Sequence, residues 1–315
     1  MIYWGINALN HGSSLAVFKE GKLVSQTTST ADTLSSDQTV NALSYYGAPD
    51  RIFWYERPWV KKARQVYAGQ YKTALDMSTL PKRHLTQFKY AKVSYSPHHG
   101  SHAAAGYYTS PFGHCAVVVL DAIGEFECAT IWEGNHGRLK KVWSRSYPHS
   151  LGLFYSAYTQ YVGLTPIRDE HILQQMAAQG NSHLFLNSVR KHFAEGVLNL
   201  KTNFHRGLYW EDNQLMTLQE QCDLAAAVQQ VFEEQVELVM QKAKELTGAD
   251  CLVYMGGCAM NSAANKNKVE PMFKYRWSLP NPGDPSSSIG AVLYHTQQRV
   301  WDQRWDPVKH IEINV

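Results

Sequence analysis

Cysteines are few, and none of them forms a recognisable pair. The 315 residues contain five, an odd number, and no two stand in a C-x-x-C spacing. Most lie in apolar runs, where a thiol behaves as a small buried hydrophobic group. The sequence therefore predicts reduced thiols.

Long hydrophobic runs and a secretory leader are also missing. No apolar run approaches the roughly 18 residues of a membrane span, and no basic start precedes an apolar stretch and a cleavage site. The formal net charge of +3 is too small to indicate nucleic acid by itself. We expect a cytoplasmic protein without a membrane partner, and the charge disfavours a nucleic-acid partner.

The chain also lacks a low-complexity linker, and its predicted elements fall into two similar series. Strands are expected over residues 2–8, 14–19, 22–27 and 51–55 with a helix over 37–46, and further strands over 115–120, 126–133, 138–146 and 251–255. Hydrophobic residues make up 44% of the chain, enough for a sizeable core. The repetition predicts an internal duplication of an α/β unit in one tight, two-lobed body.

Helices are expected to dominate the rest of the second series. They are predicted over residues 151–162, 170–178, 184–193, 218–246 and 285–298. The longest has a capping box, Thr217 with Glu220, and a glycine stop at Gly248.

Three histidines stand close together in the segment Ser96–Gly106, which is rich in small residues and predicts a helix. His98 and His102 are four residues apart, so a helix places both imidazoles on one face, where one metal ion can bridge them. Such pairs also arise by chance in a chain with 14 histidines, and many are solvated or bonded to backbone. The spacing raises a metal-site hypothesis and leaves that alternative open.

Two turns next to predicted strands are candidates for holding phosphates. One contains Asp121 and Gly124, and the other contains Gly256, Gly257 and Asn261. Backbone N–H groups in such turns can face an anion. A glycine pair after a strand is also common as a simple tight turn. Two lobes with strand-turn-strand loops around a cleft are the plan of the actin, sugar-kinase and heat-shock-protein ATPases.

Basic and aromatic side chains alternate in the segment Trp59–Tyr71. We interpret it first as a surface loop and second as a binding site for an anionic ligand.

Taken together, these blocks resemble the O-carbamoyltransferases of the nodulation-factor and antibiotic-tailoring type. The main domain of that family is similar to the tRNA threonylcarbamoyladenosine transferase subunit. The matching blocks are 11–16, 55–58, 98–103, 121–125, 150–155, 169–171, 176–180, 256–261, 283–284 and 289–291. The resemblance implies an α/β fold of two duplicated actin-like ATPase (ribonuclease-H-like) lobes around a central cleft. Lobe I would span 1–110 and end in the histidine helix, lobe II would span 111–303, and a tail would follow over 304–315.

The resemblance also implies a divalent metal on His98, His102 and Asp284. Iron(II) is expected, with zinc and manganese as alternatives. Two imidazoles and one carboxylate leave coordination positions open for a substrate oxygen. For Asp284 the alternative is a helix N-cap, because Asp followed by Pro is a common helix start.

The implied reaction takes carbamoyl phosphate and ATP through a carbamoyl-adenylate, and transfers the carbamoyl group to a hydroxyl of a small acceptor. The acceptor would be a sugar, a nucleoside or a natural product. The two glycine turns, with Asp121 and Asn261, would bind the nucleotide and its phosphates. His11 would contact the carbamoyl group or take the acceptor proton, and Glu170 is a candidate catalytic or acceptor-contacting carboxylate.

The sequence departs from the family in one large respect. Relatives continue into a second, adenylate-forming domain, whereas this sequence stops at Val315. Either a separate protein supplies the activated carbamoyl group, or this chain performs both steps, or it keeps a narrower function. Two alternatives to a small-molecule carbamoyltransferase stay open, a tRNA-modifying threonylcarbamoyl-type transferase and a non-catalytic nucleotide-binding subunit.

Overall fold

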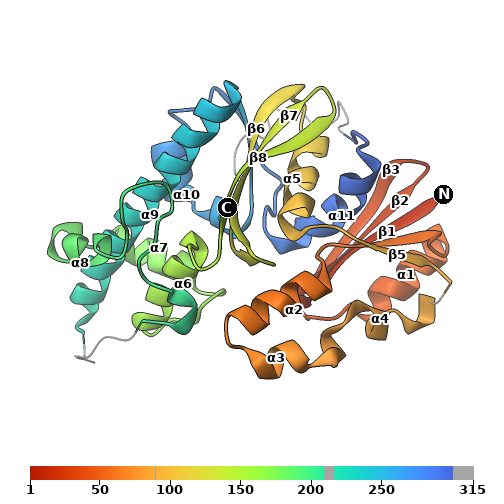
Figure 1. The fold of residues 1–315 in the computed structure, drawn as a ribbon, viewed down its shortest axis with the longest axis horizontal. Helices are drawn as coiled ribbons and strands as arrows, with labels where there is room; N and C mark the ends of the chain where they lie inside the picture. The colour runs from red at the N-terminus through yellow and green to blue at the C-terminus, as the bar shows by residue number, and fades with distance from the viewer. Residues whose placement is uncertain (89, 209–215, 301–315) are drawn as a thin grey trace.

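Two five-stranded sheets of identical topology form the centre of the fold (Figure 1). The structure is a computed structural model, and it describes residues 1–88, 90–208 and 216–300. The first sheet has the order β3-β2-β1-β4-β5, and the second has the order β8-β7-β6-β9-β10. In both, the first three strands along the chain are antiparallel neighbours and the last two run parallel to the first. This repeated topology confirms the predicted duplication and the actin-like, two-lobed α/β fold class.

The strands of the first sheet are β1 (Ile2–Asn10), β2 (Gly12–Lys19), β3 (Lys22–Ser29), β4 (Arg51–Trp54) and β5 (Lys92–Tyr95). Those of the second sheet are β6 (His114–Gly124), β7 (Glu127–Asn135), β8 (Arg138–Ser146), β9 (Cys251–Met255) and β10 (Tyr275–Trp277). The short fifth strand of each sheet was not predicted, because three or four residues are too few to show a period.

The helices that precede the second sheet are α1 (Ser36–Tyr46), α2 (Pro58–Tyr67), α3 (Tyr71–Leu75), α4 (Pro81–His84) and α5 (His98–Thr109). Those that follow β8 are α6 (Leu151–Tyr161), α7 (Glu170–Ala177), α8 (Leu186–Arg190), α9 (Leu218–Thr247), α10 (Ser262–Ala264) and α11 (Ser287–Thr296). None of the helices in these described ranges is long and apolar enough to cross a membrane.

Helices α5 and α11 pack against each other between the two sheets (Figure 1). A Cβ atom on Gly290 of α11 would lie 1.7 Å from the carbonyl oxygen of Ser101 in α5. A Cβ atom on Gly5 of β1 would likewise lie 1.8 Å from the carbonyl oxygen of Ser288. These glycines allow backbones to approach where any side chain would collide. The two helices are thereby held in contact with each other and with the first sheet.

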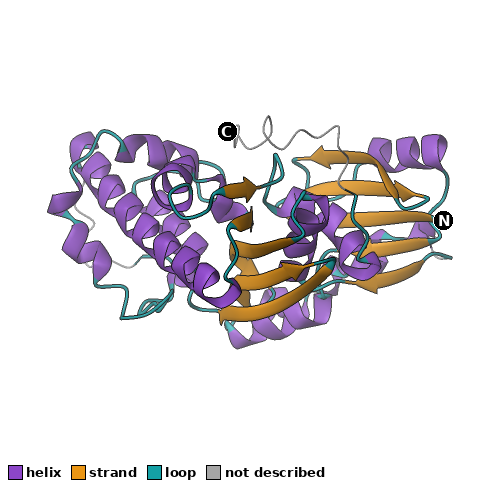
Figure 2. Cartoon of the chain, turned by 90° about the horizontal axis from the view of Figure 1, so that it is seen from above, coloured by secondary structure: helices purple, strands orange, loops and turns teal. Residues whose placement is uncertain are grey.

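Helix α9 packs against the opposite face of the second sheet together with α6. Figure 2 shows this group of helices at the far end of the molecule, beyond the strands. The predicted capping box is present, since Thr217 accepts from the backbone N–H of Glu220 and the Glu220 side chain returns to Thr217. Gly248 ends the helix with a left-handed φ of 62°. The predicted start and stop of α9 are confirmed.

Two predicted elements are wrong. The segment expected to be a surface loop from residue 59 contains α2, which begins at Pro58, a residue suited to the first turn of a helix. The helix expected over 184–193 is reduced to α8, because Phe193 leaves it to form an isolated bridge with Leu200. The predicted tail over 304–315 lies outside the described residues, and the lobe boundary at residue 110 stays a prediction.

Candidate metal centre

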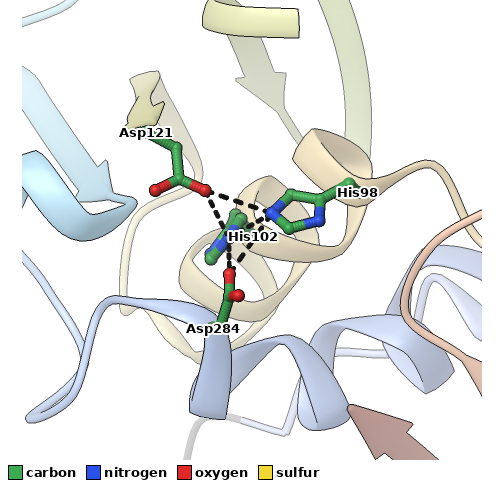
Figure 3. Close-up of side chains that lie close together, drawn as sticks. All are labelled: His98, His102, Asp121 and Asp284. Atoms are coloured by element: carbon green, nitrogen blue, oxygen red, sulfur yellow. Dashed lines mark hydrogen bonds and ion pairs between the residues drawn. The ribbon is translucent and has the colours of Figure 1, made fainter. Parts of the chain in front are cut away.

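Four side chains converge on one point between the two sheets: His98, His102, Asp121 and Asp284 (Figure 3). One donor atom from each lies within 4.8 Å of the others. The Nε2 atoms of His98 and His102 are 3.1 Å apart, and each lies 3.3 Å from Oδ1 of Asp284. Oδ2 of Asp121 lies 3.1 Å from His98 Nε2 and 3.6 Å from His102 Nε2. The structure thus brings together all three predicted metal ligands and adds a fourth candidate.

Both imidazoles come from the first two turns of α5, which is buried along its whole length. His98 is 1% exposed and His102 is fully buried, so the alternative of a solvated histidine pair is wrong. A helix that is covered on every side needs small residues where its neighbours come closest. Gly100 meets this need, because a Cβ atom there would lie 2.7 Å from the ring of Tyr294.

Asp284 enters the site from the segment before α11. It is the first residue of a 3-10 turn, Asp284–Ser286, and the N-cap position of that turn is Gly283. Oδ1 faces the two histidines, and Oδ2 accepts a hydrogen bond of 3.2 Å from Nδ2 of Asn10. The N-cap alternative is therefore wrong, and Asn10 is a contact of the site that the sequence analysis missed.

Asp121 lies where β6 leaves its regular pairing with β7, a bulge between Leu120 and Gly124. Its Oδ2 faces the histidines, while its Oδ1 accepts from the backbone N–H of Gly257 at 3.3 Å. The predicted phosphate-binding aspartate is thus placed among the candidate metal ligands. One signal was present in the sequence, because ligands of α/β sheets bind at the carboxyl ends of strands and Asp121 follows a buried apolar run.

The two carboxylates and the two imidazoles of the cluster shift one another's pKa values. Burial lowers the pKa of His98, but the charge of Asp284 and the hydrogen bond with Asp121 outweigh it and hold that pKa well above its usual range. The pKa of His102 is raised by the same two carboxylates against the effect of burial. Burial raises the pKa values of Asp121 and Asp284, yet the two imidazoles reverse this and hold both below their usual range. Two ionised carboxylates inside the fold require positive charge between them.

The donor set fits a divalent transition metal. Imidazole nitrogens and carboxylate oxygens suit iron, zinc and manganese, and four donors leave room for further ligands in an octahedral metal. The second ring nitrogen of His98, Nδ1, is buried and has no hydrogen-bond partner among the described residues. A metal on Nε2 fixes the proton on Nδ1, and that proton then requires an acceptor. His99 differs, because burial lowers its pKa well below its usual range and its Nδ1 is 3.0 Å from Thr130 Oγ1.

The predicted phosphate-binding glycines lie beside the cluster, where the close packing leaves no room for a side chain at Gly124 or Gly256. A Cβ atom on Gly124 would lie 2.4 Å from Cδ2 of His98, so only glycine leaves that ring its space. Gly256 has a φ of 93°, and a Cβ atom there would lie 2.2 Å from the Leu120 carbonyl oxygen. Gly257 follows, with its N–H on Asp121. Both turns therefore border the cluster, and their role toward phosphate stays a prediction.

Three other predicted site residues are not part of the cluster. His11 is exposed in the β1–β2 turn, next to Asn10. Glu170 accepts from the Ser156 hydroxyl at 2.7 Å and from the backbone N–H of residue 167. Asn261 exchanges two hydrogen bonds of 3.0 Å with Gln229 and caps α10. Their predicted roles stay predictions.

The basic residues of α2 are engaged within the protein. Lys62 donates to the carbonyl oxygens of Thr73 and Asp76, and Arg64 donates to the carbonyl oxygen of Glu125. Arg57, just before α2, donates from its backbone N–H to Glu125 Oε1 at 2.6 Å and pairs with the same carboxylate through its guanidinium. These contacts attach α2 to the β6–β7 turn beside the cluster.

The sequence matches the family described as Carbamoyltransferase N-terminus over residues 56–293. The chain belongs to this carbamoyltransferase family. The match contains all four residues of the cluster and the glycine turns that border it.

The individual relatives of this family member are longer proteins with low sequence identity to it. An uncharacterized protein of Synechocystis sp. is 28% identical over 354 residues, with 95% of this chain and 58% of the relative covered. The nodulation protein NolNO of Sinorhizobium fredii is 23% identical over 240 residues, with 70% of this chain and 35% of the relative covered. The chain thus spans about half the length of the curated relatives it matches, or less. Among solved structures, component A of the Acidaminococcus fermentans (R)-2-hydroxyglutaryl-CoA dehydratase has a TM-score of 0.49 at 12% identity, with 94% of this chain and 99% of that chain covered.

Proposed function

We propose that this chain catalyses metal-dependent transfer of a carbamoyl group to a hydroxyl of a small acceptor. The convergence of His98, His102, Asp121 and Asp284 on one point carries the proposal, together with membership of the carbamoyltransferase family. A divalent metal bound there, with iron(II) expected and zinc or manganese as alternatives, would act as a Lewis acid toward an oxygen of the carbamoyl donor.

The donor is carbamoyl phosphate or the carbamoyl-adenylate made from it with ATP. In the transfer, the bond from the carbamoyl carbon to the phosphate oxygen breaks and a bond to the acceptor oxygen forms. The acceptor hydroxyl loses its proton, which requires a nearby base. His11 is the candidate for that base, since it is exposed and adjoins Asn10, which contacts Asp284.

The protein must also hold and orient the carbamoyl donor. The turns at Gly124 and at Gly256–Gly257 border the cluster, which would place donor phosphates beside it. Asn261 supports the second turn through its bonds to Gln229 rather than by offering a free amide. Glu170 lies at the start of α7 as a candidate contact for the acceptor.

The chain is expected to accept carbamoyl-adenylate better than carbamoyl phosphate and ATP, because the role proposed for the metal centre is carbamoyl transfer and not adenylate formation. A separate adenylate-forming protein would then supply the activated donor as a partner. Robust turnover from carbamoyl phosphate and ATP alone would contradict this part of the proposal.

The test is incubation of the iron-loaded protein with isotope-labelled carbamoyl phosphate, ATP and an extract of cellular metabolites, followed by mass detection of a labelled carbamoyl adduct. A parallel reaction receives carbamoyl-adenylate directly. We expect an adduct on a hydroxyl compound with the wild type, and none with Asp284→Asn, which keeps the size of the side chain and removes its charge. Glu234→Gln, which removes an ion pair with Arg190 on the surface of α9, is the matched control. No adduct from either donor would contradict the proposal.

A further inference from the structure

Glu56 is a buried carboxylate next to the four candidate metal ligands. The proposed reaction gives it no role. It lies two residues after the end of β4 and is 5% exposed. The residue before it, Tyr55, accepts a hydrogen bond of 2.8 Å on its carbonyl oxygen from Ser101 Oγ in α5. The end of β4 is therefore tied to the helix that carries both histidines.

The two oxygens of Glu56 face different partners. Oε1 accepts from Lys61 Nζ at 2.8 Å, and Oε2 lies 4.0 Å from Nδ1 of His98. In the part of the chain that the structure describes, buried His98 Nδ1 has no hydrogen-bond partner, while Nε2 of the same ring faces the other three members of the cluster. Glu56 is thus the carboxylate that the back of the His98 ring faces.

An imidazole that binds a metal through one nitrogen usually donates the N–H of the other to a carboxylate, a carbonyl or water. That outer contact fixes the tautomer and the orientation of the ring. We infer that Glu56 is the positioning residue of His98, accepting its Nδ1–H when Nε2 binds the metal, with Lys61 holding the carboxylate in place. The inference rests on the metal centre of the proposed function.

A purely structural role for Glu56 makes a different prediction. If the carboxylate served only to anchor α2 through Lys61, loss of either partner would have the same effect. If it positions His98, removal of Lys61 leaves the essential contact intact. Glu56→Gln and Lys61→Met therefore separate the two roles. In Gln an NH2 donor replaces one of the two carboxylate oxygens, so that Lys61 and His98 can no longer each face an acceptor oxygen of their own.

The experiment measures cobalt(II) binding to metal-free protein by competition with a chromophoric chelator, and records the visible spectrum of the bound cobalt. We expect stoichiometric binding by the wild type and about 10- to 100-fold weaker binding by Glu56→Gln, with a changed spectrum. For Lys61→Met the loss should stay below about tenfold, with the wild-type spectrum. Glu127→Gln, which removes an ion pair with Lys141 on the second sheet, is the matched control and should bind as the wild type does. Far-UV circular dichroism checks folding, and Glu56→Asp, which withdraws the carboxylate by one methylene, replaces Glu56→Gln if that variant does not fold.

The outcomes separate the two claims. Binding by the Glu56 variant that equals the wild type would overturn this inference alone, and so would a Lys61→Met variant as weak as Glu56→Gln. A wild type that does not bind cobalt stoichiometrically would overturn the metal centre and, with it, the proposed function and this inference.

Discussion

Helices α5 and α11 occupy equivalent positions in the two copies of the fold, yet they contribute different chemistry. Each follows the fifth strand of its own sheet. Helix α5 begins three residues after β5 ends and carries two imidazoles on its first two turns. A longer connection joins β10 to α11, and the candidate metal ligand Asp284 lies in that connection.

The difference shows how a symmetric framework can give an asymmetric site. The duplication places the starts of two helices side by side, and Gly290 against Ser101 holds them there. The nature of the site then depends on which residues occupy those starts. Nitrogen donors come from one helix, and an oxygen donor comes from the approach to the other.

Separation of α5 from α11 should have the largest effect on the stability of the fold and on the site. Gly290→Ala would place a methyl group 1.7 Å from the Ser101 carbonyl oxygen, which is backbone and cannot move aside. We expect a loss of about 3 kcal/mol in the free energy of unfolding, measured in urea, together with loss of bound metal. Gly113→Ala is the matched control, because the nearest atom there is 3.9 Å away and the substitution should be close to neutral. Equal stability of the two variants would show that the helices do not meet in this way.

The next largest effect is expected from the imidazoles of α5. His102→Ala should lose the metal and the activity while remaining folded, whereas His99→Ala should keep the metal, although both rings are fully buried on the same helix. Both variants should lose about 1–3 kcal/mol of stability, because each leaves a buried polar neighbour without its partner. Metal content measured by elemental analysis distinguishes them. Stoichiometric metal and normal turnover in His102→Ala would refute the site.

A smaller effect is expected from pH on the metal-free protein. The pKa of His98 is raised in the fold, so its protonated form contributes stability that is fully present below about pH 6.5. That contribution is lost as the pH rises through the raised value. Thermal unfolding of metal-free protein should show lower stability at about pH 9 than at about pH 7. Saturating metal should remove the loss, and Asp284→Asn should reduce it, since Asp284 is one cause of the raised pKa. A metal-free protein equally stable at both pH values would contradict the electrostatic description of the cluster.

The smallest effect is expected at the β1–β2 turn, which touches the α11 side of the site. Asn10→Ala removes the hydrogen bond to Oδ2 of Asp284 and should weaken metal binding by about three- to tenfold. Asn199→Ala is the control, because its side chain donates to the carbonyl oxygen of Glu195 and to no other acceptor among the described residues. Cobalt titrations of both variants measure the difference, and equal affinities would mean that Asp284 needs no support from this turn.

What the sequence predicted well is what depends on local pattern. The histidine pair, the capping box of α9 and the repeated strands are all set by spacing along the chain. Asp284 was predicted as a metal ligand from the family resemblance, because the adjacent sequence does not distinguish a metal ligand from a helix N-cap. Asp121 was predicted to bind phosphate, and its place in the cluster was missed. Its carboxylate faces the histidines because of the bulge at the end of β6, which the sequence pattern does not reveal.

Helix α2 is a second case in which the local sequence pattern did not predict the contacts of the side chains. Its alternating basic and aromatic residues suggest an exposed ligand-binding segment, yet Lys62 and Arg64 are buried and donate to backbone carbonyl oxygens outside the helix. Buried cations of this kind depend on acceptors that no local pattern reveals. Glu56 was hidden for the same reason, since its partner His98 is supplied by another element.

The spread of the site along the chain has a consequence for how the protein matures. His102 and Asp284 are separated by 182 residues, and all of the second sheet lies between them. A nascent chain that has completed α5 presents two imidazoles to any ion in its surroundings without the carboxylate that would retain it. If the proposed metal binds there, loading of the complete ligand set would wait until synthesis has passed Asp284, and the choice of ion would then depend on the metal supply around the finished polypeptide.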